Sequence, residues 1–243
     1  MTSVFCRGRR CSSEEGQGRL KLFLDISRLV FGTWKGTPTG IDRVEMAYAR
    51  YWLNHDPDRV TFLLRASIGA FVAVPRSLVR DLLVALDTRR LGGPGGPDAD
   101  KAARSAARTA LTRLSLGRGM GDVANVLKSE NDIAYLLVSH LGADRPDPIA
   151  ALKRKGVKFV PLVHDLIPEA FPEYATPAGV RRHTQRVEAF TGLADGMIAN
   201  SRTTAADIAS FLVPGSNMPD IVSAPLGIEC GPAPNSTGHL AQP

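Results

Sequence analysis

His164 and Asp165 directly follow the apolar segment 157–163, at the point where a buried strand would end. An imidazole at the end of a strand could hydrogen-bond a sugar hydroxyl or a developing charge, and a neighbouring carboxylate could orient its ring. The alternative is a histidine that only caps nearby backbone. We take His164 as the candidate catalytic residue and Asp165 as a candidate ligand-binding residue.

The glycine-rich segment GTWKGTPTGIDR, residues 32–43, is the second candidate. Glycines let backbone N–H groups approach a ligand, and a helix that starts at the end of this segment adds positive potential. We expect a phosphate or a sugar near Gly36, Thr39, Gly40 and Arg43. The segment lacks the Gly-Lys-Ser/Thr of a P-loop and the G-x-G-x-x-G of a dinucleotide site. The alternative is an ordinary connection between a strand and a helix.

A third candidate lies in DGMIANSRTTAADI, where Asn200, Ser201 and Arg202 stand between a short apolar segment and a helical pattern. Either Asn200 or Ser201 could cap the helix, and free N–H groups at its start could hold an anion. We predict the cap, and ligand contact is a hypothesis that goes with it.

Metal and nucleophile signatures are weak. The residues that could be drawn as a metal cluster have a spacing that matches no ligand pattern, so we expect no metal. They are His164, Asp165, Glu169, Glu173 and His183. Cys6 and Cys11 have no further cysteine or histidine at ligand spacing, G-x-S-x-G is absent, and Cys230 has no evident base.

Residues 101–116 form a basic amphipathic helical pattern with an alanine-rich apolar stripe. Such a helix could lie on an anionic membrane, but alanine inserts weakly, so a helix that covers the sheet is the simpler interpretation. Nucleic-acid binding is not expected, because no aromatic residues alternate with the basic ones. The basic residues are Lys101, Arg104, Arg108 and Arg113.

Strand patterns alternate with helical patterns along the chain, which predicts an α/β fold with a Rossmann-like, doubly wound, mostly parallel sheet. Ligands of such sheets bind at the carboxyl ends of the strands. The chemistry should therefore lie in the loops 27–40, 139–147 and 164–175 and around Asn200 and Ser201. The strands are predicted at 21–26, 60–64, 69–74, 133–138, 157–163, 196–199 and 221–226, and the helices at 41–52, 76–86, 101–116, 148–155, 177–192 and 201–212, with a breaker at 91–97.

The composition is that of a globular chain. It has 243 residues, 44% of them hydrophobic, and a formal net charge of +6, which excludes wholesale disorder. No run of apolar residues is long enough to span a membrane, and three cysteines cannot form a disulfide framework, so a cytoplasmic location is expected. We predict a disordered leader over 1–19, one domain over 20–229 and a disordered tail over 230–243.

Four stretches occur in an order typical of one enzyme family: DISRLVFG with TPTGIDRV, then VHDLIPEAFPEY, then ADGMIANSRTTAADIASFL, then APLGIE. Over about residues 21–229 the chain resembles the N-terminal, acceptor-side domain of GT-B fold glycosyltransferases, in particular the family 4, mannosyltransferase-like group. The resemblance implies transfer of a sugar with retention of configuration, without a bound cofactor and usually without a metal. The donor would be a nucleotide sugar such as GDP-mannose or UDP-glucose, and the acceptor a glycan or a lipid-linked sugar.

The resemblance also assigns roles. Gly40 and its neighbours would lie near the donor diphosphate, with Arg43 in the helix beneath; His164 would reach the transferred sugar, and Ser201 with Arg202 would line the cleft. The family's pair of glutamates separated by seven residues, which lies in its donor-binding domain, has no counterpart here. We therefore expect negligible turnover by this chain alone, and a further domain or a partner chain that supplies the donor site.

Two other functions remain open. One is a non-catalytic interaction or regulatory domain derived from such an enzyme. The other is an unrelated nucleotide-dependent enzyme, such as an epimerase or a dehydrogenase, against which the absence of G-x-G-x-x-G counts. A role in polysaccharide assembly at the inner face of a membrane would follow from the resemblance, with the basic helix as the point of membrane contact.

Overall fold

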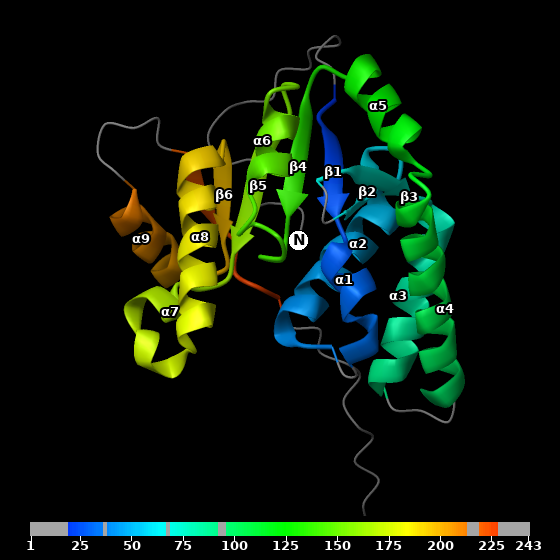
Figure 1. The fold of residues 1–243 in the computed structure, drawn as a ribbon, viewed down its shortest axis with the longest axis horizontal. Helices are drawn as coiled ribbons and strands as arrows, with labels where there is room; N and C mark the ends of the chain where they lie inside the picture. The colour runs from blue at the N-terminus through cyan, green and yellow to red at the C-terminus, as the bar shows by residue number, and fades with distance from the viewer. Residues whose placement is uncertain (1–18, 36–37, 67–68, 92–95, 213–218, 228–243) are drawn as a thin grey trace, which may run out of the picture.

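The computed structural model describes residues 19–35, 38–66, 69–91, 96–212 and 219–227 (Figure 1). Within them seven strands form one sheet in the order β3-β2-β1-β4-β5-β6-β7, and the β2–β3 pair is antiparallel whereas the other pairs are parallel. The predicted α/β class with a mostly parallel sheet is confirmed, and the strand order is consistent with a Rossmann-like fold. The strands are β1 (Lys21–Asp25), β2 (Val60–Arg65), β3 (Phe71–Val74), β4 (Ile133–Leu137), β5 (Lys158–Val163), β6 (Gly196–Ala199) and β7 (Asp220–Ser223).

Both faces of the sheet are apolar, because successive strand residues point to opposite sides. Leu22, Leu24 and Leu136 face one group of helices, α1 (Ser27–Gly32), α2 (Gly40–His55), α3 (Arg76–Leu91) and α4 (Gly96–Ser115). Phe23 and Tyr135 face the other group, α5 (Met120–Ser129), α6 (Asp147–Lys153), α8 (Pro177–Leu193) and α9 (Arg202–Phe211). The result is a layer of helices on each side of the sheet (Figure 1).

The prediction of a loop over 27–40 is wrong in its first part. Helix α1 begins two residues after β1, and a 3-10 turn, η1 (Thr33–Lys35), continues it. Leu29 and Val30 of α1 are buried against the sheet. Packing therefore favours a helix in a segment whose sequence predicts a loop.

Other element boundaries also differ from the predictions. Helix α5 was not expected, although Val123, Val126 and Leu127 have helical spacing and pack on the sheet. The predicted loop 164–175 contains α7 (Ile167–Ala170) and the 3-10 turn η2 (Pro172–Tyr174). The last strand is β7 at 220–223, shorter than predicted, and α4 begins at Gly96, inside the predicted breaker.

The alanine stripe of α4 is part of the core. Ala103, Ala107 and Ala110 are fully or almost fully buried, and α4 packs against α3 and β3. The stripe therefore cannot lie on a membrane, which agrees with the alternative of a helix that covers the sheet. Two of the basic residues have acidic partners, since Lys101 lies 3.6 Å from Asp98 and Arg104 lies 2.8 Å from Asp100. No helix in the described parts of the chain is both long and apolar enough to cross a bilayer.

The predicted leader apart from Arg19, the predicted tail, and Cys6, Cys11 and Cys230 lie outside the described residues, as does Gly36.

Candidate functional site

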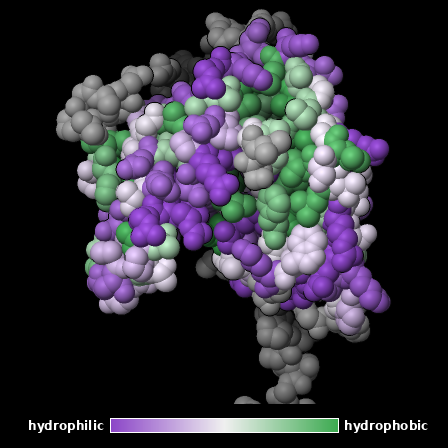
Figure 2. Space-filling model, viewed as in Figure 1, coloured by the Kyte–Doolittle hydropathy of each residue, from purple (hydrophilic) through white to green (hydrophobic). Residues whose placement is uncertain are grey.

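The sheet has its switch point between β1 and β4. From β1 the chain adds strands on one side as far as β3, and it then returns to place β4 on the other side of β1. Connections from these two strands leave in opposite directions, which opens a crevice at their carboxyl ends. Figure 2 shows the surface hollowed there, between the side formed by α7 and α8 and the side formed by α1 and α2.

His164 lies at the carboxyl end of β5, as predicted, and is buried with 6% of its surface exposed. Its ring Nε2 lies 2.8 Å from the carbonyl oxygen of Val138, and because a carbonyl only accepts, Nε2 carries the proton. Burial lowers the pKa of His164, so the ring is neutral at pH 7 and Nδ1 is left as an acceptor. Asp165 does not hold the ring as predicted, because its Oδ1 accepts from the backbone N–H of Ile167 at 3.2 Å.

A second histidine supports the first. His140 follows β4 and is buried, and its Nε2 accepts a hydrogen bond of 3.4 Å from the backbone N–H of His164. The two ring centroids are 5.3 Å apart. Burial, followed by the charges of His164, His183 and Arg186, lowers the pKa of His140 to about 3, so this ring is also neutral. His140 thus helps to hold the backbone of His164, the candidate catalytic residue, in place.

His183 and Glu169 form a further contact near the rings of His140 and His164. The Nδ1–H of His183 donates to Glu169 Oε1 at 3.2 Å, and the hydroxyl of Thr184 donates to the same oxygen at 2.9 Å. These bonds hold α7 against α8. In the described parts of the chain no group of three or more histidine, cysteine or acidic residues is arranged to hold a metal.

The polar side chains at the start of α9 mainly stabilise the fold. Ser201 caps α9 as predicted, since its Oγ accepts from the backbone N–H of Thr204 at 3.0 Å. Asn200 Oδ1 accepts from the Thr204 hydroxyl at 2.9 Å. The hydroxyl oxygen of Thr204, a residue that the sequence did not single out, also lies 3.4 Å from the carbonyl oxygen of His164, so the start of α9 lies beside the end of β5. Arg202 is exposed and free to meet a ligand.

The N-terminus of α2 is capped and open to solvent. Thr39 and Asp42 form a reciprocal capping box. Arg28 of α1 joins them, with Nε 2.6 Å from Asp42 Oδ1 and Nη2 3.2 Å from Thr39 Oγ1. A Cβ atom added at Gly40 would meet nothing within 4 Å, so the space above this backbone is empty. Arg43 is exposed on the first turn.

Two buried carboxyl groups lie behind the crevice. Asp25 ends β1 and accepts from the backbone N–H of Ser27 at 2.7 Å and from the hydroxyl of Tyr135 at 2.5 Å. Glu45 of α2 accepts from the backbone N–H of Leu29 at 3.1 Å. Burial raises the pKa of both carboxyls, and with the added charge of Asp25 it raises that of Glu45 to about 8.

Glu45 is incompletely satisfied. Its Oε2 and the hydroxyl of Ser139 are both buried, and neither has a partner at hydrogen-bonding distance among the described residues. The Ser139 hydroxyl is nevertheless near enough to lower the pKa of Glu45 against the larger effect of burial. Protonation of Glu45 removes a negative charge that would otherwise be buried with too few hydrogen-bond partners.

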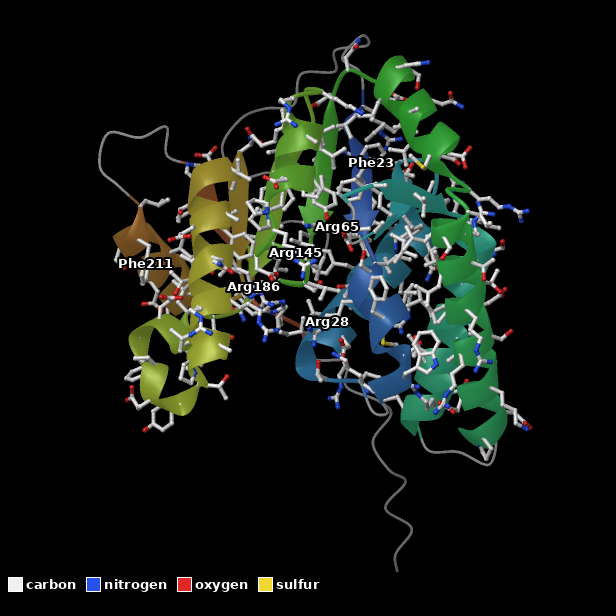
Figure 3. The ribbon with its side chains drawn as sticks, viewed as in Figure 1. Phe23, Arg28, Arg65, Arg145, Arg186 and Phe211 are labelled. Carbon is white, nitrogen blue, oxygen red and sulfur yellow. The ribbon has the colours of Figure 1, made fainter. Side chains whose placement is uncertain are left out.

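Arginine side chains surround the crevice. Figure 3 shows Arg28 of α1, Arg145 of the β4–α6 loop and Arg186 of α8 around the gap between α1 and α8, with Arg65 behind them at the end of β2. Arg65 is 8% exposed, and its Nη2 donates to the carbonyl of Arg145 at 2.5 Å. The site therefore combines positive charge at its rim with neutral imidazoles at its floor.

Most of the residues that form the crevice and the buried groups behind it were not singled out from the sequence. The loop 139–147 was singled out, but His140 and Arg145 within it were not, although both follow a predicted strand end. Glu45 interrupts the apolar face of a helical pattern, which is a signal that could have been used. Asp25 and Tyr135 meet only because β1 and β4 are neighbours, and no local pattern indicates that pairing.

The fold and the site define an α/β protein with a cationic crevice at the switch point of a mostly parallel sheet. No protein-family model matches the chain, and no curated protein matches it at a significant level.

Proposed function

We propose that this chain is the acceptor-side domain of a retaining glycosyltransferase that uses a nucleotide sugar such as GDP-mannose or UDP-glucose. The observation that carries the proposal is His164, which offers a neutral Nδ1 acceptor at the end of β5 beside an arginine-lined crevice. A neutral imidazole can accept a hydrogen bond from a sugar hydroxyl, and the arginines suit the phosphates of a donor. The sequence resemblance supplies the reaction type.

The open backbone at Gly40 supports the same proposal. The N-terminus of a long helix suits a diphosphate. The N–H of Asp42 donates to Thr39 Oγ1, but the N–H groups of Gly40 and Ile41 have no partner among the described residues. Arg28, held by Asp42 and Thr39, brings a guanidinium to this end of α2. The donor-binding domain that the proposal requires would face this end of the sheet and supply most of the contacts with the nucleotide. This chain alone should therefore bind a nucleotide sugar weakly, through His164 and the start of α2.

A non-catalytic domain derived from such an enzyme is the second candidate. One observation favours it: Asn200 and Ser201 are used by the α9 cap, and one nitrogen of His164 is used by the backbone. These side chains then need no ligand to explain their positions.

The proposal is tested by NMR titration of the labelled chain with UDP-glucose, GDP-mannose, the free nucleoside diphosphates and NAD. We expect saturable shifts of the His164 ring signals with a nucleotide sugar, and smaller ones with the diphosphate alone, because the hexose is the part that reaches His164. His55 is the internal control, since it ends α2 and stacks on Tyr51 at 4.3 Å, away from the crevice. A His164 signal that responds to NAD only, or to none of these ligands at millimolar concentration, would contradict the proposal.

A further inference from the structure

Arg182 and Arg186 lie one turn apart on α8 and present two guanidinium groups on the same side of the helix. Arg186 has 24% of its side chain exposed, and its nearest carboxylate oxygen, Asp144 Oδ1, is 3.7 Å from Nε. That distance is too long for a hydrogen bond, and Nε is buried without another partner among the described residues. Burial, with the like charges of Arg182 and Arg28, lowers the pKa of Arg186, although an arginine stays protonated at pH 7.

Arg145 adds a third cation from the β4–α6 loop, and its backbone is fixed. Its N–H donates to the carbonyl of Gly142 at 3.0 Å, and its carbonyl accepts from Arg65. Gly142 has a positive φ of 78°, and a Cβ there would lie 3.1 Å from the Arg65 guanidinium, so the turn is closely packed on Arg65. In the part of the chain that the structure describes, neither Arg145 nor Arg182 has an acidic partner.

The charges on this side of the crevice do not balance. Among the described residues, Asp144 is within ion-pair distance of Arg186, no carboxylate is paired with Arg145 or Arg182, and His140 and His164 are neutral. Like charges held close together repel one another, and an anion would remove that repulsion. Guanidinium groups bind phosphate oxygens in pairs, with a geometry that a carboxylate or a phosphate matches.

We propose that Arg145, Arg182 and Arg186 form a binding site for a phosphate group carried by the acceptor. The site belongs to the α8 side of the crevice, opposite the N-terminus of α2 at which the donor phosphates are proposed to lie. That the phosphate belongs to the acceptor rests on the proposed function, whereas the phosphate site itself rests on the arginines alone. The phosphate could belong to a lipid headgroup or to a soluble sugar phosphate, and the experiment separates the two.

The crevice is open to solvent, which suits the end group of a larger molecule. A phosphate held by α8 would place the group attached to it beside His164.

The experiment measures binding of inorganic pyrophosphate, mannose 1-phosphate and mannose to the full chain by calorimetry, without any nucleotide sugar. We expect pyrophosphate and mannose 1-phosphate to bind and mannose not to bind. R182Q and R186Q should each weaken the binding about tenfold, the loss expected for one hydrogen bond to a charged group. R181Q is the matched control, because Arg181 is the exposed neighbour on the same helix and should change binding less than about twofold.

A second arm uses vesicles that contain phosphatidic acid. Vesicle binding that R186Q weakens assigns the phosphate to a lipid headgroup, and mannose 1-phosphate binding without vesicle binding assigns it to a soluble acceptor. The proposal is overturned if no phosphate compound binds, or if R181Q weakens binding as much as R182Q and R186Q do. Because no sugar is transferred in this experiment, its failure would leave the NMR test of the proposed function unaffected.

Discussion

Glu45 is fully buried, and its carboxyl binds a proton more tightly in the folded chain than in the unfolded one. The pKa rises from 4.5 to about 8, so the folded state holds one more proton than the unfolded state between these values. The free energy of unfolding should therefore fall as pH rises from about 5 to about 8. Asp25, whose pKa burial also raises, contributes in the same direction.

The variant E45Q tests this account. Glutamine keeps an oxygen for the N–H of Leu29 and does not titrate, so E45Q should lose the part of the pH dependence that comes from Glu45 and be relatively more stable near pH 8. Urea unfolding at about pH 5 and about pH 8 measures the change. E188Q, on the exposed side of α8, should keep the slope of the original chain. An unchanged slope in E45Q would show that Glu45 is ionised in the folded state.

The titration of His140 should change the free energy of unfolding with pH in the direction opposite to that of Glu45. Its pKa falls from 6.5 to about 3, so the unfolded state binds the extra proton and stability is lost as pH drops from about 6.5 towards 3. H140N removes this titration, and the loss of stability between pH 7 and pH 5 should be smaller in the variant than in the original chain. H55N, at the exposed end of α2, is the control. Equal losses in H140N and the original chain would contradict the assignment.

The residues of the site could be predicted from the sequence only where they follow a strand. His164 and Ser201 were found in this way, and both lie where they were expected. The arginines were not found, because Arg28, Arg145 and Arg186 belong to separate elements and become neighbours only after the sheet has formed. Buried hydrogen bonds such as that of Asp25 with Tyr135 are equally long-range.

Most of the helices could be predicted from spacing and caps, and two of the three that were missed, α1 and α5, have physical reasons. Helix α1 is only six residues long and ends where the glycine-rich segment begins, so its burial decides its conformation. Helix α5 begins after Gly119, which is in the left-handed region with a φ of 102°, and a cluster of glycines hides the apolar spacing behind it.

Two glycines at helix starts should differ in their tolerance of alanine. At Gly119 a Cβ would lie 2.4 Å from the carbonyl oxygen of Ala73, in addition to the strained φ, so G119A should cost about 2–4 kcal/mol of unfolding free energy. At Gly40 nothing is within 4 Å, so G40A should change stability by less than about 1 kcal/mol. Urea unfolding measures both.

The G40A variant also separates an effect on the stability of the fold from an effect on ligand binding. If a diphosphate approaches the start of α2, the added methyl group should weaken nucleotide-sugar binding although the fold is intact. A loss of stability in G40A similar to that in G119A would show that Gly40 is needed by the fold.

At the scale of the whole molecule, the strand order decides the location of the site. The sequence predicts the alternation of strands and helices, but it does not say on which side of β1 the chain places β4, because a connection can run to either side. The return from β3 to β4 creates the switch point, with α1 and α2 on one side and α7 and α8 on the other. The charge of +6 is spread over the chain, whereas the crevice gathers several arginines in one place.

The central claim is that a nucleotide sugar binds at this crevice with its hexose at His164. A crystal structure of the chain soaked with GDP-mannose or UDP-glucose tests it most directly. We predict a hexose hydroxyl about 3 Å from His164 Nδ1, with the diphosphate near Gly40 and Arg28. A nucleotide sugar bound elsewhere on the chain, or a crevice that stays empty in crystals whose solvent channels reach it, would contradict the claim.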